Sequence, residues 1–253
     1  DHFQYIQKAI KSDVQICSIS GGTDIISCFA LGNPLIPVFD GEIQSIGLGM
    51  AVKIFNETGQ EAVKEEKGEL VCTQPFPSMP IGFFNDPDRK KYKKSYFNKF
   101  ENTWAHGDFA TITKNNGVII FGRSDATLNS GGVRIGTAEI YRQTEKFPQI
   151  LDAVVIETTK SSESILILFL VLKKDEELTN DLIKKIRFEL KTNASPRHIP
   201  QSIIQVDDIP RTISGKISEL SVKAAIEGEE IKNIDALANP DSLSIYREFA
   251  KEN

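Results

Sequence analysis

The sequence predicts a mixed α+β protein in two parts, and three features indicate this fold class. Short β-rich runs separated by glycine and proline occupy Leu35–Cys72, whereas short strand and helix patterns alternate after the central stretch that ends at Glu139. The polar, glycine-bearing stretch Gly122–Glu139 lies between them, after an apolar strand pattern and before a helical one. A chain of 253 residues is long enough for one large or two modest domains.

Composition and charge exclude several classes of function. Hydrophobic residues make up 40% of the chain, and no apolar run approaches the roughly 20 residues that span a bilayer, so we expect a soluble protein without a membrane partner. A net charge of −5 argues against non-specific nucleic-acid binding, which needs a basic surface. The widely spaced Cys17, Cys28 and Cys72 are typical of reduced thiols in a cytosolic protein.

The first element that we expect is a buried strand at Val14–Ile19, which leads into Ser20-Gly-Gly-Thr-Asp24. Backbone amides at Gly21 and Gly22 and the hydroxyl of Thr23 can contact a phosphate, and the Asp24 carboxylate can hold Mg²⁺. A plain turn between two strands is the alternative interpretation.

The next segment contains short β runs and one basic run. Residues 35–72 carry strand patterns broken by glycine and proline, with a hairpin turn expected at Asn56–Gly59. The basic run Asp88–Lys94 is predicted to be a solvated loop, and a phosphate-binding or localisation patch is the alternative.

A carboxylate suited to binding hydroxyl groups follows the single tryptophan. Asp108 stands after a glycine in Trp104-Ala-His-Gly-Asp108, where we expect a turn before the strand Phe109–Thr113. An aspartate fixed in this way can accept hydrogen bonds from two vicinal hydroxyls. His106 can titrate near neutral pH, although a structural imidazole is the favoured interpretation.

The central stretch Gly122–Glu139 is predicted to be a loop with hinge and anion-binding properties. The pair Gly131-Gly132 allows a ligand to approach the backbone closely, and Arg123 and Arg134 can each bind phosphate or carboxylate. The alternative is a loop that only joins two domains.

The second part is predicted to be a small unit of three strands with helices between them. The strands are expected at Ala153–Ile156, Ile165–Leu172 and Ser202–Val206, and the apolar character of the second predicts burial on both faces. One helix begins after Thr179 as its cap, and another covers Glu219–Ile226.

A lysine-bearing loop, Pro210-Arg-Thr-Ile-Ser-Gly-Lys216, precedes that last helix. Its turn residues place Lys216 on a mobile tip, from which a long cation can enter a cleft and neutralise phosphate oxygens. A solvated surface lysine is the alternative.

Together these motifs resemble the adenylate-forming superfamily of acyl-CoA synthetases, luciferases and peptide-synthetase adenylation domains. The resemblance runs from about Ser18 to Ser221, with the motifs in the family's order. It implies the C-terminal part of the large adenylation domain in residues 1–124, a small α+β lid in residues 125–253, and a hinge at Asp125. The branch resembled most activates acetoacetate, as judged from Ser-Gly-Gly-Thr-Asp24, Trp-Ala-His-Gly-Asp108, Arg197-His-Ile-Pro200 and Asn239-Pro-Asp-Ser-Leu-Ser-Ile-Tyr246.

The resemblance also implies roles for the candidate residues and three small molecules, ATP, Mg²⁺ and coenzyme A. Lys216, Thr23 and Arg134 take the catalytic positions, Lys216 driving adenylation, and Asp24 takes the metal position. The nucleotide and CoA positions fall on Gly21, Gly22, Thr23, Asp24, Asp108, Arg123, Gly131, Gly132 and Arg134. Asp108 and Arg123 are at the ribose, Arg134 faces the phosphate and acyl group, and Gly131-Gly132 lines the tunnel of the CoA thiol.

The function that follows is an AMP-forming acid–thiol ligase, which makes acetoacetyl-AMP and transfers the acyl group to CoA. The chain departs from the family at Ser20, Asp24 and His106, where an aromatic residue, Glu and Thr are usual. The phosphate loop and the acyl pocket are absent, so we expect an N-terminal remainder of the same polypeptide before Asp1, and no turnover by residues 1–253 alone. A synthetase for acetate or propionate, or a non-catalytic interaction protein, is the alternative.

Overall fold

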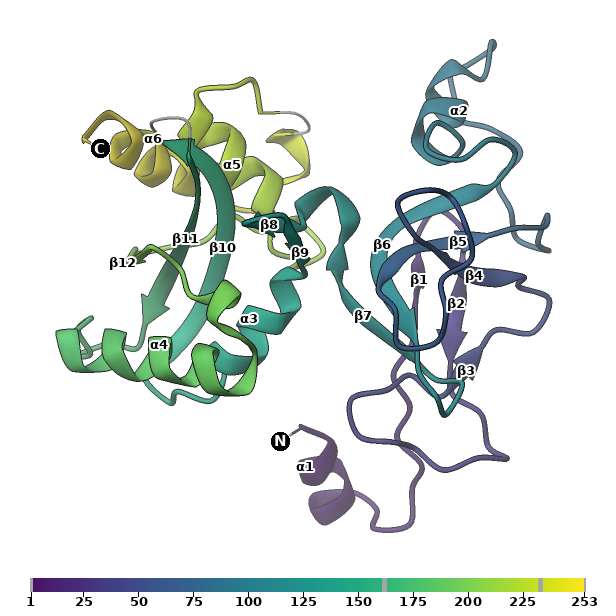
Figure 1. Cartoon of the computed structure of the whole chain (residues 1–253), viewed down its shortest axis with the longest axis horizontal. Helices are drawn as coiled ribbons and strands as arrows, with labels where there is room; N and C mark the ends of the chain where they lie inside the picture. The colour runs from purple at the N-terminus through teal and green to yellow at the C-terminus, as the bar shows by residue number, and fades with distance from the viewer. Residues whose placement is uncertain (1, 161–162, 232–233, 253) are drawn as a thin grey trace. The chain divides into compact units, whose positions relative to one another are not determined.

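The chain divides into two compact units, which we describe separately (Figure 1). The computed structural model describes residues 2–160, 163–231 and 234–252. Unit 1 comprises Asp1–Ile120 and unit 2 comprises Phe121–Asn253, so the division falls within strand β7 (Val118–Arg123). None of the helices in these described ranges is long and apolar enough to cross a membrane.

Unit 1 is built from two sheets. A three-stranded antiparallel sheet has the order β1-β2-β3, and a four-stranded sheet has the order β4-β5-β6-β7. Phe29, Leu70 and Trp104 are almost fully buried in one apolar core that draws on both sheets. The strands are β1 (Ser20–Gly22), β2 (Ser27–Leu31), β3 (Ser45–Ile46), β4 (Val52–Phe55), β5 (Gly68–Cys72), β6 (Trp104–Ile112) and β7.

Two predictions for unit 1 can be judged directly. The turn at Asn56–Gly59 is confirmed, because the amide of Gly59 donates to the carbonyl of Asn56 at 3.0 Å. The strand at Val14–Ile19 is wrong: these residues are not part of any strand, and Ile19 is 66% exposed. Alternating apolar residues form a strand only when a neighbouring strand pairs with them, and the described residues offer this run no such neighbour.

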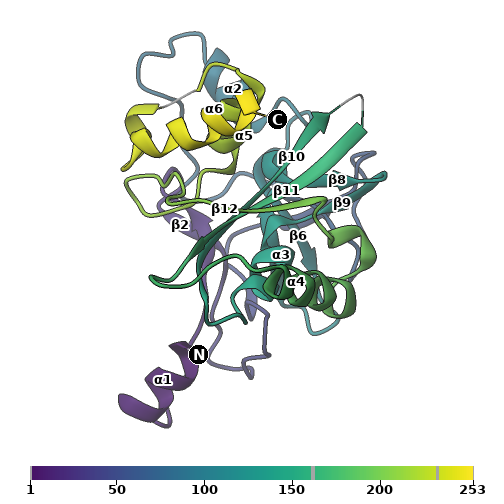
Figure 2. The ribbon, with the colours of Figure 1, turned by 90° about the vertical axis from the view of Figure 1, so that its left-hand side faces the viewer.

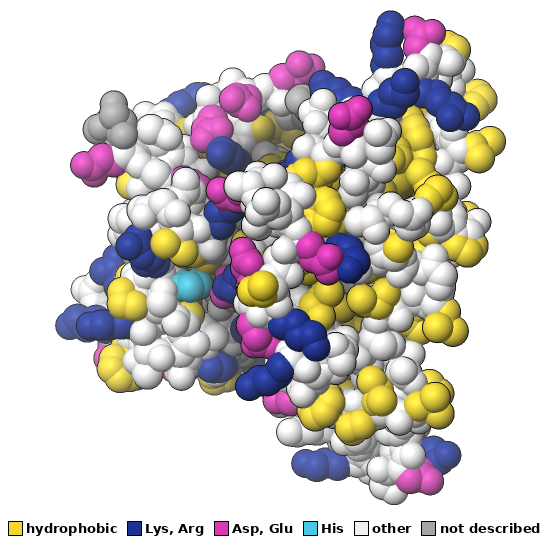
Figure 3. Space-filling model, turned by 45° about the vertical axis from the view of Figure 1, so that its right-hand side comes forward, with side chains coloured by type: hydrophobic (Ala, Val, Ile, Leu, Met, Phe, Trp, Pro, Cys, Tyr) yellow, Lys and Arg dark blue, Asp and Glu magenta, His cyan; other side chains and the backbone are white. Residues whose placement is uncertain are grey.

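The basic run is also not a loop, because it lies largely in helix α2 (Lys90–Tyr96). Asp86 caps this helix, accepting hydrogen bonds from the amides of Lys91 (3.1 Å) and Tyr92 (2.8 Å). Tyr92 is buried while the lysines are exposed, and dark blue side chains cluster over α2 in Figure 3. A further helix, α1 (His2–Ala9), was not predicted.

Unit 2 is a three-layer α+β unit around a sheet of order β10-β11-β12. Strand β10 (Ile150–Lys160) pairs antiparallel with β11 (Glu163–Leu172), which pairs parallel with β12 (Ser202–Gln205). One face is covered by α3 (Thr137–Thr144) and α4 (Asn180–Asn193), and the other by α5 (Glu219–Glu227) and α6 (Leu243–Glu252) (Figure 2).

The sheet of unit 2 separates two cores, as the prediction of a doubly buried strand required. Along β11, Leu166, Leu168 and Leu170 enter the α3–α4 core, whereas Ile167 and Phe169 enter the α5–α6 core. This division follows from the period of two in a strand, which sends successive side chains to opposite faces.

Helix α4 forms as predicted, because its cap and its apolar face agree. The hydroxyl of Thr179 accepts a hydrogen bond from the amide of Leu182 at 3.2 Å. Leu182, Ile186 and Leu190 are buried against the sheet. The sequence did not predict α6, whose Tyr246 is fully buried beside Phe169 with 5.0 Å between the ring centroids.

Two matched core substitutions test whether the units unfold separately. We expect Leu168→Ala to destabilise unit 2 and Leu70→Ala to destabilise unit 1, each by about 2–5 kcal/mol, because both side chains are completely buried. Hydrogen exchange of the β10–β11 and β5–β6 amides, measured on one sample, checks this expectation. Equal acceleration in both units by either substitution would contradict it.

Candidate functional site

The first candidate motif forms the tip of a β-hairpin rather than an open loop. Gly21 and Gly22 belong to β1, which pairs with β2, and residues 23–26 make the connecting turn. Thr23 and Asp24 are exposed at this tip, while Ile25 is completely buried and anchors it. The backbone therefore forms the turn between two strands that was the alternative interpretation. The side chains of Thr23 and Asp24 remain accessible to a ligand.

The glycines of this hairpin allow close packing. A Cβ atom at Gly22 would lie 2.1 Å from Oδ1 of Asp24 and 2.9 Å from Cε1 of His106. A Cβ atom at Gly21 would lie 2.1 Å from the backbone oxygen of Ser27. A larger residue at Gly21 would therefore clash with strand β2, and one at Gly22 would clash with Asp24 and with His106 of β6.

An aromatic row connects this tip to β6. The hydroxyl of Tyr96 donates to Oδ2 of Asp24 at 2.5 Å, and its ring stacks on Trp104 with 3.6 Å between centroids. Nε1 of Trp104 donates to Nδ1 of His106 at 3.4 Å, and Nε2 of His106 lies 3.9 Å from Oδ2 of Asp108. Asp24 and Asp108 thus lie at the two ends of one row. The burial of His106 favours a structural role for its imidazole.

Asp108 lies within strand β6, which corrects the predicted glycine turn. The pairing of β5 with β6 shifts register here, and Gly107 has a φ of +82°. The amide of Gly107 donates to Oε1 of Glu69 at 2.9 Å, and Oε2 of the buried Glu69 pairs with Nζ of Lys99 at 2.5 Å. The bulge therefore fixes the direction of Asp108, and the isolated Glu69 gave no sequence signal for this role.

The central stretch is an ordered β-hairpin preceded by a short 3₁₀ turn, not a loop. Strands β8 (Leu128–Ser130) and β9 (Val133–Ile135) pair across the two-residue turn Gly131-Gly132. Both glycines have positive φ, +57° and +82°, as a type I′ hairpin turn requires. A Gly-Gly pair predicts such a turn as readily as a loop, and the strands on each side are too short to show a periodic pattern.

The two arginines of this stretch contact the predicted hinge. Nε of Arg123 lies 3.5 Å from Oδ1 of Asp125, and both side chains are half exposed. Arg134 donates to the carbonyl of Ser124 at 3.1 Å and to the hydroxyl of Thr127 at 2.9 Å. Arg134 therefore braces the segment around Asp125 from strand β9.

The lysine loop is closed by its own hydrogen bonds. The amide of Thr212 donates to the carbonyl of Lys216 at 2.8 Å, and the amide of Lys216 donates to the Thr212 hydroxyl at 3.1 Å. Gly215 provides the positive φ, +83°, at the tip. The Lys216 side chain is exposed.

The Gly-Gly hairpin and the lysine loop lie on opposite faces of the unit 2 sheet. The amide of Asn129 donates to Oε2 of Glu157 at 2.6 Å, and Arg211 of the lysine loop pairs with Asp152. Asp152 and Glu157 are five residues apart on β10, about 16 Å at roughly 3.3 Å per residue, and the odd spacing sends their side chains to opposite faces.

A partly buried carboxyl, that of Glu219, lies at the start of α5, near the hinge. Glu219 accepts hydrogen bonds from the hydroxyls of Tyr141 (3.1 Å) and Thr137 (3.3 Å). Burial raises the pKa of Glu219, and the charge of Asp125 adds to the shift. Burial, followed by the charge of Glu219, raises the pKa of Tyr141.

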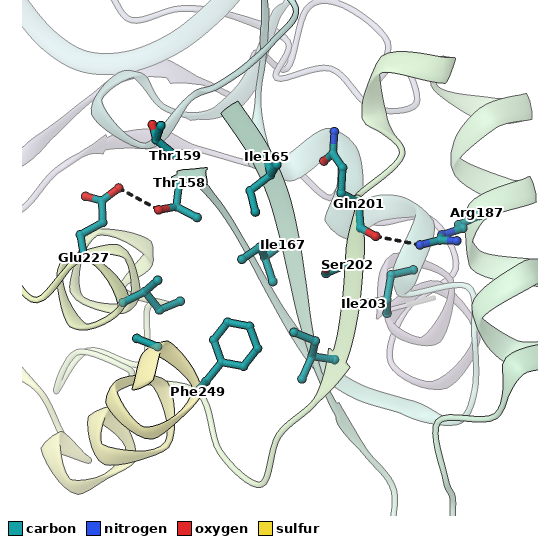
Figure 4. Close-up of a pocket in the computed structure, with 13 residues that line it drawn as sticks. Thr158, Thr159, Ile165, Ile167, Arg187, Gln201, Ser202, Ile203, Glu227 and Phe249 are labelled. Carbon is teal, nitrogen blue, oxygen red and sulfur yellow. Dashed lines mark hydrogen bonds between the residues drawn. The ribbon is translucent and has the colours of Figure 1, made fainter. Parts of the chain in front are cut away.

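A groove of about 850 Å³ in unit 2 contains none of the predicted site residues (Figure 4). Its lining combines apolar residues, among them Ile165, Ile167 and Phe249, with polar ones. Arg187 donates to the carbonyl of Gln201 at 2.9 Å at one side of the groove.

Comparison with known sequences identifies relatives over nearly the whole chain. Residues 144–216 match the family described as the AMP-binding enzyme C-terminal domain. Acetoacetyl-coenzyme A synthetase of Rhizobium meliloti (strain 1021) is 53% identical over 244 residues, which are 96% of this chain and 37% of the relative. Acetoacetyl-CoA synthetase of Xenopus tropicalis is 46% identical over 247 residues, 97% of this chain and again 37% of the relative. The chain thus spans about 37% of the length of these relatives.

Solved structures give the same result. Acetoacetyl-CoA synthetase from Streptomyces lividans matches with a TM-score of 0.91 and 39% identity, covering 99% of this chain and 38% of that one. A benzoate CoA ligase from Burkholderia xenovorans LB400 matches with a TM-score of 0.67 and 22% identity, covering 80% of this chain and 39% of that one. The second likeness concerns the fold alone.

The raised pKa of Glu219 leads to a prediction about stability. A carboxyl with a raised pKa in the fold favours folding while it is protonated, and this contribution is lost as pH rises through the raised value. We therefore expect Glu219→Gln to stabilise unit 2 at about pH 8 and to have little effect at about pH 4.

Thermal unfolding at both pH values checks this expectation, with the exposed Glu176→Gln as the matched control. An equal effect of Glu219→Gln at both pH values would show that the Glu219 carboxyl does not titrate differently in the fold.

Proposed function

Since the chain belongs to the adenylate-forming superfamily, as a homologue of the C-terminal portion of acetoacetyl-CoA synthetases, we propose that it serves an acetoacetate–CoA ligase. In this proposal the chain acts with a preceding segment that supplies the phosphate loop and the acyl pocket. The substrates are acetoacetate, ATP and coenzyme A, and the site of action is the cytosol. Residues 125–253 act as a lid that turns at Asp125.

The observation that carries this proposal is the placement of the two candidate turns on opposite faces of one sheet. Lys216 belongs to the α5–α6 side and Gly132 to the α3–α4 side. A rigid unit cannot present both faces to one bound ligand at the same time. A two-step reaction with a rotation between the steps uses this arrangement.

In the first step, a carboxylate oxygen of acetoacetate attacks the α-phosphorus of ATP, and the bond to pyrophosphate breaks. The nucleophile is already ionised, so no general base is needed. Lys216, exposed on its tip, neutralises the charge that develops on the phosphate oxygens. Asp108, fixed by the β6 bulge, accepts hydrogen bonds from the ribose hydroxyls, and Thr23 donates to a phosphate.

Asp24 fits a magnesium ion that is shared with the nucleotide. Mg²⁺ in such sites is held by one or two carboxylates together with substrate phosphates and water. In the parts of the chain that the structure describes, no group of three or more His, Cys, Asp or Glu residues could hold a metal ion by itself. When bound, the ion would neutralise phosphate charge, and Tyr96 would keep the Asp24 carboxylate in position.

In the second step, the thiol sulfur of CoA attacks the carbonyl carbon of acetoacetyl-AMP. The carbonyl–oxygen bond to AMP breaks, and the thiol proton passes to solvent. The Gly131-Gly132 turn leaves space for the pantetheine arm, because a Cβ atom at Gly132 would meet nothing within 4 Å. Arg123 and Arg134 act from the hinge, toward the ribose and toward the phosphate and acyl group.

Lys216→Ala should impair the first step by about 10²-fold or more and leave the second intact, because it removes a cation used only in adenylation. Gly132→Asn should do the reverse: it adds a side chain in the thiol path, and asparagine tolerates positive φ. Leucine at Gly132 would confound the test through backbone strain.

The measurements are pyrophosphate release and conversion of supplied acetoacetyl-AMP by the full-length polypeptide. Lys174→Ala, an exposed lysine elsewhere in unit 2, is the matched control. Equal losses in both steps for Lys216→Ala and Gly132→Asn would rule out the division of labour.

The identity of the acid is tested separately. We expect CoA-dependent AMP formation to be fastest with acetoacetate when the full-length polypeptide is assayed with acetoacetate, acetate and propionate. Preference for acetate or propionate would assign another short acid to the same mechanism, and no turnover with any of them would favour a non-catalytic role.

A further inference from the structure

Each of the two candidate turns in unit 2 is held by an arginine that donates to at least one carbonyl group at its tip. We propose that Arg197 is a positioning residue for the thioester step and Arg211 for the adenylation step. This inference rests on the proposed function, because it gives the two turns their separate roles. Neither arginine needs to contact a substrate in this role.

Arg197 reaches the Gly-Gly turn from a different segment of unit 2. It lies in the short 3₁₀ helix η2 (Pro196–His198). Its Nη1 donates to the carbonyl of Ser130 at 3.0 Å and to the carbonyl of Gly131 at 2.9 Å. These two carbonyls lie next to each other at the tip, so one guanidinium nitrogen fixes the direction of the turn.

The two glycines of the turn meet different surroundings. A Cβ atom at Gly131 would lie 2.6 Å from Nη1 of Arg197, whereas a Cβ atom at Gly132 would meet nothing within 4 Å. Gly131 therefore gives the guanidinium room to approach the backbone, and Gly132 faces open space. This asymmetry is expected if Gly131 leaves room for Arg197 and Gly132 leaves room for the ligand.

The backbone that carries Arg197 is itself fixed. The hydroxyl of Ser195 accepts from the amide of Arg197 at 3.2 Å and lies 2.8 Å from Nδ1 of His198. His198 is buried, with Nε2 at 3.7 Å from Oε1 of Glu139. The other oxygen of Glu139 accepts from the amide of Gly136, just after β9, at 2.9 Å. The η2 segment thus contacts the tip of the hairpin directly and is linked to its end through Glu139.

Arg211 belongs to the lysine loop itself and joins the tip of that loop to strand β10. Its Nη1 donates to the carbonyl of Gly215, next to Lys216, at 2.5 Å. Its Nε and Nη2 donate to Oδ2 of Asp152 on β10, the first at 3.1 Å. The ion pair with Asp152 compensates the charge of Arg211, so that Lys216 is the cation that this loop offers to the phosphate.

The physical need for a brace arises from the glycines. Glycine has more backbone freedom than any other residue. A turn that uses glycine to leave room for a ligand therefore has a poorly restricted backbone conformation. A donor fork that holds two carbonyls, or a carbonyl and a carboxylate, restricts this freedom before the ligand arrives. Misplacing a reacting group by about 1 Å can cost on the order of 10²-fold in rate.

The test is a pair of substitutions in which each variant is the control for the other. In the full-length polypeptide, we expect Arg197→Ala to slow conversion of supplied acetoacetyl-AMP with CoA by roughly 10- to 100-fold and to leave pyrophosphate release unchanged. We expect Arg211→Ala to slow pyrophosphate release to a similar extent and to leave the thioester step unchanged.

Hydrogen exchange gives a readout that does not depend on activity. In the 253-residue chain, Arg197→Ala should accelerate exchange of the Val133 amide beside the Gly-Gly turn, and Arg211→Ala that of the Lys216 amide. Arg211→Lys keeps a charge for Asp152 but lacks the planar fork, so it covers the case in which Arg211→Ala fails to fold. We expect Arg211→Lys to lie between wild type and Arg211→Ala in pyrophosphate release.

Two results would overturn the inference. If exchange at a turn does not change when its arginine is removed, the arginine does not hold that turn. If exchange rises while the rate of the matching half-reaction is unchanged, the arginine stabilises the turn but does not contribute to that half-reaction. Gly132→Asn separates these results from a failure of the proposed function. If Gly132→Asn loses the thioester step and Arg197→Ala does not, only the role of Arg197 is overturned. If neither variant loses the thioester step, the role of the Gly-Gly turn itself is overturned.

Discussion

The antiparallel ladder between β10 and β11 is the constraint on which the functional geometry of unit 2 depends. Successive side chains of both strands point into different cores. An element that contacts one of these side chains therefore lies on the face to which that side chain points. Glu157 ties the Gly-Gly hairpin to the α3–α4 face, and Asp152 ties the lysine loop to the α5–α6 face. A slip of one residue in this register would exchange the faces of every side chain in the strand.

Patterns contained within one element predicted most of unit 2. The apolar run of β11 and the Thr179 cap of α4 are local signals, and both elements formed where they were expected. Elements that depend on partners distant in the sequence were not predicted. Val14–Ile19 alternates like a strand but lacks a paired neighbour among the described residues, and α2 depends on tyrosines that pack against Trp104.

The candidate site shows the same limit. The sequence motifs named Asp24, Asp108, the Gly-Gly pair and Lys216, and their placement as ligands and catalytic residues stays a prediction. The residues that hold them could not be predicted, because each acts across a long separation in sequence: Tyr96 on Asp24, Arg197 on Gly131 and Arg211 through Asp152. An isolated tyrosine or arginine has no pattern that indicates its partner, whereas a glycine pair or a conspicuous lysine loop does.

We propose that unit 2 presents one face for adenylation and the other for thioester formation, and this alternation can be measured. The decisive measurement is of the distances from a spin label in unit 1 to labels beside Gly132 and beside Lys216 in the full-length polypeptide. The distances are measured with ATP and acetoacetate, and then with acetoacetyl-AMP and CoA. We expect the Lys216 distance to lengthen and the Gly132 distance to shorten on passing from the first state to the second. Distances that change in the same sense, or that do not change, would contradict it.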